Sequence, residues 1–315
     1  MKISISIEAM LGMTWPLWKQ MVPELESMGF ATIFRSDHFP LGVPGVTDAL
    51  ELITSLTYLA EHTSRVDFGS MVAPISVRDP VMLARQAMSL NDLSGGRMIL
   101  GVGSGWQEAE HTTFGYKLGS LKTRFDRLAE GLEVITGLVR SPQPVDFEGK
   151  FYTLQQARLL PRPQQPTRIL VGGSGPKRTL PLVARFADLW NCMSSVAAFR
   201  DLSARLDQLL VNEGRQPGDV KRTVMIPIIV WRTQQEFDQM MDMLRLKPFF
   251  SGASNEEVAK RNAAMNGIMG TPEQVIEGMQ AYADAGVDEF IIQWSNLTDW
   301  NGLEILAKNV LPHYA

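Results

Sequence analysis

The chain has 315 residues, of which 45% are hydrophobic and 20% are charged, and its formal net charge is -4. This composition is typical of a folded globular protein and excludes a disordered or fibrous one. No run of five or more Lys and Arg residues occurs, which argues against a nucleic-acid partner. No apolar stretch is long enough for a membrane span or an export signal, and the single cysteine, Cys192, excludes an internal disulfide. We therefore expect a cytoplasmic protein with no membrane partner.

Strand-like and helix-like segments alternate along nearly the whole chain. Ile3, Ile5 and Ile7 alternate with polar residues, which predicts a first strand, and the helix that follows begins near Pro16 and ends at Gly29. Further strands are predicted at residues 31–34, 66–74, 97–102, 168–171, 189–193, 222–231 and 290–294, with helices between them. Such alternation favours a parallel sheet that closes into a (β/α)8 TIM barrel, and the length fits one domain over residues 1–315.

Two segments interrupt the alternation. Residues 142–166 contain VDFEG and KFYTL around Gly149, which predict a small hairpin after the fourth helix, and we expect this insertion to lie over the strand ends. Residues 234–268, after the seventh strand, predict two extra helices that are candidates for a lid. The loop from Phe39 to Val46 holds two prolines and two glycines, so it cannot continue a strand or a helix.

Active sites of α/β barrels gather at the carboxyl ends of the strands. His38 is the best acid–base candidate there, because an imidazole titrates near neutrality and the carboxylate of Asp37 would fix its tautomer. The alternative is that the two residues only cap a turn. His62, His111 and His313 show no metal-ligand spacing, so we expect surface positions for them and no metal site. The other polar or glycine-rich features at strand ends are Glu8, Ser70, Gly103 to Trp106, Gly172 to Lys177, Asn191 and Trp294.

Two glycine-rich segments suggest a ligand. Gly101, Gly103 and Gly105 alternate at the end of a strand and leave one face bare, so a planar ligand could lie against the backbone. The alternative is that they only allow close helix packing. GGSGPKR, at residues 172–178, offers backbone N–H groups and two cations to an anion, although most such helix starts bind only water.

Six motifs together resemble the luciferase-like (β/α)8 flavin and deazaflavin oxidoreductases, and in particular their branch that depends on coenzyme F420. The resemblance spans nearly the whole chain, and it implies hydride transfer between F420 and a small organic substrate, in a homodimer. The motifs are SDH at residues 36–38, LSGGRMILGVGSGWQEAEHTTFG at 93–115, RFDRLAEGLEVI at 124–135, FEGKFYTL, ILVGGSGPKRTLPLVARFADLWN and GTPEQVIEGMQAYADAGVDEF.

The resemblance also implies roles for individual residues. His38 would be the catalytic proton donor or substrate contact, with Asp37 beside the cofactor ring. A non-prolyl cis peptide between Ser70 and Met71 would support the back of the ring. Trp106 stands where the sugar-phosphate dehydrogenases of the superfamily carry a catalytic glutamate, which argues against sugar-phosphate oxidation. The other cofactor-binding residues implied are Ser104 and Gly105 at the ring, and Gly172, Gly173, Ser174, Gly175, Pro176 and Lys177 at the phosphate.

Three other functions compete with this prediction. An FMN-dependent monooxygenase would use reduced flavin and oxygen in the same pocket, and a non-enzymatic barrel would only bind a flavin. A metal-dependent hydrolase has too few carboxylate and histidine ligands at the strand ends. The substrate depends on the loop from Phe39 to Val46 and on the two insertions, whose sequences do not identify it.

Overall fold

A computed structural model of the chain describes residues 1–40, 48–246 and 248–314. The predicted loop from Phe39 to Val46 therefore lies mostly outside the described residues. The strands are β1 (Lys2–Ile7), β2 (Thr32–Arg35), β3 (Asp67–Ser70), β4 (Ala73–Pro74), β5 (Met98–Gly103), β6 (Val145–Glu148), β7 (Thr153–Ala157), β8 (Arg168–Gly172), β9 (Leu189–Cys192), β10 (Lys221–Val230), β11 (Ile268–Gly270) and β12 (Glu289–Trp294). The α-helices are α1 (Trp15–Ser27), α2 (Leu52–His62), α3 (Pro80–Leu93), α4 (Glu108–Phe114), α5 (Leu121–Arg140), α6 (Thr179–Phe186), α7 (Val196–Asn212), α8 (Gln234–Arg245), α9 (Asn255–Ala264), α10 (Pro272–Ala283) and α11 (Trp300–Ile305).

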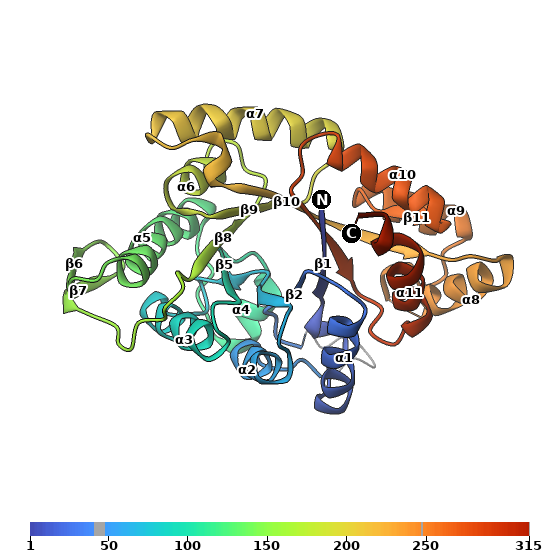
Figure 1. Cartoon of the computed structure of the whole chain (residues 1–315), viewed down its shortest axis with the longest axis horizontal. Helices are drawn as coiled ribbons and strands as arrows, with labels where there is room; N and C mark the ends of the chain where they lie inside the picture. The colour runs from blue at the N-terminus through green and yellow to red at the C-terminus, as the bar shows by residue number, and fades with distance from the viewer. Residues whose placement is uncertain (41–47, 247, 315) are drawn as a thin grey trace.

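Within the described residues, eight strands close into a parallel barrel in the order β1, β2, β3, β5, β8, β9, β10 and β12. The ring closes because β12 pairs with both β10 and β1. Figure 1 shows the strands at the centre and the helices outside them. The predicted (β/α)8 TIM barrel is therefore confirmed. No helix in the described part of the chain combines the length and apolar character that a bilayer span needs.

The barrel interior is filled by apolar side chains that alternate with those facing the helices. Leu100 of β5 belongs to the large cluster between strands and helices, whereas its neighbour Ile99 belongs to a smaller one. Such alternation follows from the period of two along a strand. Two members of the smaller cluster, Met71 and Met225, also line a cavity at the barrel mouth, so this cluster forms the floor of that cavity. Its buried members are Phe34, Met71, Ile99, Leu170, Leu189, Met225 and Ile291.

The two insertions contain the predicted secondary structure, but the hairpin lies elsewhere than expected. β6 and β7 form an antiparallel pair at the outer side of α5, at the edge of the molecule (Figure 1). Glu130 of α5 accepts hydrogen bonds from the backbone N–H groups of Lys150 and Phe151, at 3.0 and 2.7 Å. The expectation that this insertion covers the strand ends is wrong, because these contacts hold it against a helix. The second insertion forms α8 and α9 around an apolar cluster of its own.

Candidate active site

A cavity of about 450 Å³ lies at the carboxyl ends of the barrel strands. It brings together most of the side chains predicted from the strand ends. Ser70, Trp294 and the residues from Gly175 to Lys177 are not part of its described wall. The predicted residues that line it are Glu8, Asp37, His38, Met71, Gly103, Ser104, Gly105, Trp106, Gly172, Gly173, Ser174 and Asn191.

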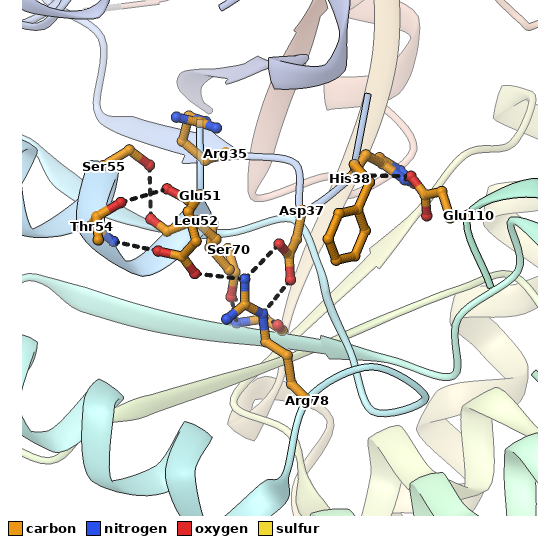
Figure 2. Close-up of polar contacts among 12 residues, drawn as sticks. Arg35, Asp37, His38, Glu51, Leu52, Thr54, Ser55, Ser70, Arg78 and Glu110 are labelled. Atoms are coloured by element: carbon orange, nitrogen blue, oxygen red, sulfur yellow. Dashed lines mark hydrogen bonds and ion pairs between the residues drawn. The ribbon is translucent and has the colours of Figure 1, made fainter. Parts of the chain in front are cut away.

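His38 is held by a buried glutamate from a distant part of the chain. Its Nδ1 atom lies 2.7 Å from Oε1 of Glu110, and the backbone N–H of Phe39 donates to the same oxygen at 3.0 Å. The side chain of Glu110, on the short helix α4, is 4% exposed, and that of His38 is 17% exposed. Figure 2 shows the two side chains facing each other. The imidazole is therefore fixed in orientation by α4.

The pKa of His38 is raised above its ordinary value. Burial alone would lower it, because burial disfavours the charged ring, but the hydrogen bond and the charge of Glu110 outweigh that effect. The charges of Glu8 and Asp37 act in the same direction. The ring can therefore hold a proton close to neutral pH, as a general acid or base requires.

Asp37 belongs to a different ion-pair network. Its carboxylate makes a bidentate contact with Arg78, with Nε to Oδ2 at 2.5 Å and Nη2 to Oδ1 at 2.7 Å. Nη2 of Arg78 also donates to Glu51 at 2.8 Å. Figure 2 shows Asp37 directed toward Arg78, while His38 is directed toward Glu110. The prediction that Asp37 fixes the tautomer of His38 is wrong, because its two oxygens are taken by the guanidinium.

The non-prolyl cis peptide bond lies between Met71 and Val72. The expected position, Ser70–Met71, is wrong by one residue. Ser70 still belongs to β3, where its hydroxyl donates to the carbonyl of Gly101 at 2.8 Å and accepts from the N–H of Gly101 at 2.9 Å. Because these bonds keep Ser70 in the sheet, the chain leaves the strand only after it. Met71 and Val72 line the cavity.

Val72 occupies the strand face that the glycines leave bare. A Cβ atom built on Gly103 would lie 2.6 Å from Cγ2 of Val72, and one built on Gly172 would lie 3.1 Å from its Cγ1. The two glycines therefore lie on the same side of the cavity, with Val72 packed against both. A planar ring can rest against this side chain rather than directly on glycine backbone, which corrects the expectation from the glycine spacing.

The loop after β8 has the features of an anion site, but only its first residues line the cavity. Gly172, Gly173 and Ser174 line it, and Gly173 is anchored by its N–H to the carbonyl of Asn191 at 2.8 Å. Lys177 is exposed, and α6 begins at Thr179 rather than near residue 176 as predicted. The loop therefore leads outward from the cavity to a helix start with cations beside it, an arrangement that suits a phosphate.

His111 is buried, so the expected surface position is wrong for this residue. It is 3% exposed and lines the same cavity. Its Nδ1 donates to the carbonyl of Gln107 at 2.7 Å, and its Nε2 lies 2.8 Å from the hydroxyl of Ser76. Both ring nitrogens are thus paired within the protein. Among the described residues, no group of three or more His, Cys, Asp or Glu side chains could hold a metal ion.

The two tryptophans considered at the strand ends differ in position. Trp106 is 63% exposed and meets His38 edge to face, with ring centroids 5.8 Å apart. Trp294 is 3% exposed, within the core. Only Trp106 is therefore placed to contact a ligand beside the imidazole.

Sequence reasoning missed three side chains at the site, namely Val72, Arg78 and Glu110. The available signal for Glu110 was its spacing of four residues from Trp106, which places both near the start of one helix. Val72 and Arg78 follow β3 in a segment without a motif. The fold brings Val72 to the cavity wall and brings Arg78 into contact with Asp37.

Fold and site together define an eight-stranded α/β barrel with a histidine–glutamate pair in a cavity at the mouth. The family model described as luciferase-like monooxygenase matches residues 12–289, and the chain belongs to this family. It is 28% identical over 310 residues to an F420-dependent glucose-6-phosphate dehydrogenase of Kineococcus radiotolerans, covering 92% of this chain and 90% of that one.

Two solved structures have the same fold. The first is an F420-dependent secondary alcohol dehydrogenase in complex with an F420-acetone adduct, with a TM-score of 0.81 and 20% identity over 98% of both chains. The second is the monooxygenase RslO1 from Streptomyces bottropensis, with a TM-score of 0.82 and 20% identity over the full length of both chains.

Proposed function

We propose that this protein is an oxidoreductase that transfers a hydride between coenzyme F420 and a small organic substrate. The observation that carries the proposal is the His38–Glu110 pair in the wall of a cavity that also contains Val72 and the loop from Gly172. The similarity to an F420-dependent dehydrogenase over 92% of the chain supports the choice of cofactor. The substrate shares this cavity and contacts His38.

The residues present fit a deazaflavin. Val72 packs on Gly103 and Gly172 and offers an apolar surface to one face of a ring, and Trp106 lies across the cavity wall beside His38. Ser104, Gly105, Asp37 and Met71 line the same cavity and would contact the ring. Residues 172–177 would hold the phosphate of the cofactor, through backbone N–H groups and Lys177. F420, when bound, accepts or donates a hydride at C5 of its ring.

The protein's own residues handle orientation and the proton. The apolar floor of Met71 and Met225 excludes water from beneath the reacting groups. His38 is the catalytic residue, and its Nε2 takes the hydroxyl proton of an alcohol, or returns it to a carbonyl in the reverse direction. Holding the substrate and the cofactor in one orientation lowers the entropic cost of the transfer.

Binding titrations test the cofactor. The purified chain should quench the fluorescence of F420 on binding and should reduce or oxidise it in the presence of alcohols or carbonyl compounds. His38→Asn should lower turnover by roughly 10²–10⁴-fold, the usual contribution of acid–base catalysis, while F420 still binds. His62→Asn, on the exposed face of α2, is the matched control. Tight binding of FMN with oxygen consumption, and no response to F420, would favour the monooxygenase instead.

We also propose that residues 1–315 form one domain and that the protein is a homodimer in the cytoplasm. A pair of rings on the first two helices supports the dimer. Trp15 of α1 is 37% exposed and meets Tyr58 of α2 edge to face, with centroids 6.1 Å apart. Light scattering after size exclusion should give twice the mass of the chain, and Trp15→Glu should lower it to that of a monomer.

A further inference from the structure

Glu110 joins two separate donors at one carboxylate oxygen. The His38 ring approaches Oε1 through Nδ1 at 2.7 Å, and the N–H of Phe39 donates to the same atom at 3.0 Å. The carboxyl group is almost fully buried, so water competes little for it. The ring and the backbone beside it are therefore held by one side chain from α4.

Opposite an ionised Glu110, this contact assigns the proton of the neutral His38 ring to one of its two nitrogens. A carboxylate oxygen only accepts, so Nδ1 must be the donor. Nε2 then has a free lone pair, and among the described residues it has no hydrogen-bond partner. Since His38 lines the cavity, Nε2 is the nitrogen available to a ligand there.

We propose that Glu110 is a positioning residue, which fixes the ring of His38 in the Nδ1–H tautomer and so presents Nε2 to the reacting oxygen of the substrate. The proposal rests on the proposed function for its catalytic consequence. When an alcohol is oxidised, its C–H bond gives up a hydride and its O–H bond gives a proton to Nε2. The products are a carbonyl compound, the reduced cofactor and an imidazolium that is stabilised by the charge of Glu110.

Several charged groups face His38, so the contribution of Glu110 must be separated from theirs. Glu8 follows β1, Asp37 follows β2, and Glu110 lies on α4. Asp37 is already paired with Arg78, and Glu8 accepts a hydrogen bond from Gln293 at 2.9 Å. Of these three carboxylates, only Glu110 contacts the imidazole directly. Removal of Glu110 should therefore change the titration and the tautomer of His38 more than removal of Glu8 or Asp37.

The first experiment uses the chain without cofactor, so it does not depend on the proposed function. Proton and nitrogen NMR of the four histidine rings would be recorded through a pH titration, with the His38 signals assigned by their loss in His38→Asn. In the wild type, nitrogen shifts should show a protonated Nδ1 in the neutral ring, and the ring should titrate above the ordinary range. Glu110→Gln should lower the pH at which the ring titrates and should give a mixture of the two neutral tautomers. Glu108→Gln, an exposed neighbour on the same helix, should change neither.

The second experiment measures steady-state turnover with F420. Glu110→Gln should lower kcat by about 10–100-fold, within the range of acid–base effects, with little change in the KM for F420 and a shifted pH profile. Glu110→Asp keeps the negative charge, so it should recover part of the lost kcat and part of the wild-type His38 titration. The same variant tests the inference if Glu110→Gln does not fold. An unshifted His38 titration in both variants overturns the inference, whatever their activity. A shifted titration in a chain that never turns over F420 supports the positioning role and rejects the proposed function.

Discussion

Because Gly103 has no side chain, the side chain of Val72 can pack against its backbone. A Cβ atom at residue 103 would lie 2.6 Å from Cγ2 of Val72, closer than real Cβ contacts allow. Gly103→Ala should therefore push Val72 into the cavity, lower the free energy of unfolding by about 1–3 kcal/mol and weaken F420 binding. Thermal denaturation and a fluorescence titration of F420 measure the two effects.

The double variant Gly103→Ala/Val72→Ala separates the clash from other effects. Removing the methyl groups of Val72 should restore much of the stability lost in Gly103→Ala, which a double-mutant cycle would record as coupling. Gly218→Ala is the control, because no atom lies within 4 Å of its added Cβ. Equal stability of Gly103→Ala and Gly218→Ala would contradict the role assigned to Val72.

The raised pKa of His38 makes stability depend on pH. Because the pKa is higher in the folded chain than its ordinary value of 6.5, the stabilisation is fully present below pH 6.5 and is lost as pH rises through the folded value. A tenfold difference in proton affinity corresponds to about 1.4 kcal/mol. The free energy of unfolding of the wild type should therefore fall relative to that of His38→Asn over this range. Urea denaturation at a series of pH values would show it, and parallel curves for the two proteins would refute it.

At the residue scale, the strand-end rule identified His38, but it paired this residue with the wrong carboxylate. Asp37 is adjacent in sequence, yet successive residues after a strand point in different directions, and Arg78 captures it. Glu110 lies 72 positions away from His38 and reaches it only through the barrel. Local spacing places Glu110 near Trp106 in the sequence, but it does not show that Glu110 pairs with His38.

Glu130 is the main polar anchor between α5 and the outer hairpin. Its two carboxylate oxygens accept from the N–H groups of Lys150 and Phe151. Glu130→Ala should lower the free energy of unfolding by about 1–2 kcal/mol and expose the hairpin to proteolysis, because two backbone donors lose their acceptor. F420 binding should not change, since the hairpin is remote from the cavity wall. Limited proteolysis and a binding titration would test both statements.

Glu133→Ala, on the same helix, is the matched control. Glu133 forms an exposed ion pair with Arg185 at 3.2 Å, and such pairs contribute little. Its loss should leave cleavage of the hairpin unchanged. If Glu130→Ala weakens F420 binding while Glu133→Ala does not, the hairpin is coupled to the site. The prediction that F420 binding does not depend on the hairpin would then be wrong.

At the element scale, the sequence predicted which residues form strands better than it predicted the surface on which an element packs. β5 is buried along its full length, and a short apolar run with glycine before it was sufficient to predict it. The hairpin was visible from its alternation around Gly149, but the surface it packs on depends on the contacts of Glu130. The start of α6 moved to Thr179 because residues 176–178 form a turn ahead of the helix.

At the scale of the whole molecule, the alternation of strands and helices was enough to predict the barrel. Closure places Gly103 and Gly172 on one side of the mouth, as a cavity for a ring requires. The charge inside that cavity could not be predicted, because it depends on which carboxylates are paired. Asp37 is compensated by Arg78 and Glu110 by His38, whereas the described partner of Glu8 is the neutral amide of Gln293.

Glu8, whose side-chain hydrogen bond is to a neutral amide, predicts a preference for uncharged substrates. Glu8 is 6% exposed and lines the cavity, so a phosphate group bound there would meet the negative charge of its carboxylate. Two unit charges roughly 8 Å apart repel by about 2 kcal/mol at an effective dielectric constant of about 20, which is roughly a thirtyfold loss in affinity. Wild-type kcat/KM with F420 should therefore be higher for a neutral secondary alcohol than for its phosphate-bearing counterpart. Glu8→Gln should narrow that difference and Glu108→Gln should leave it unchanged, whereas an equal or better rate with the phosphorylated substrate in the wild type would show that the acidic wall does not select the substrate.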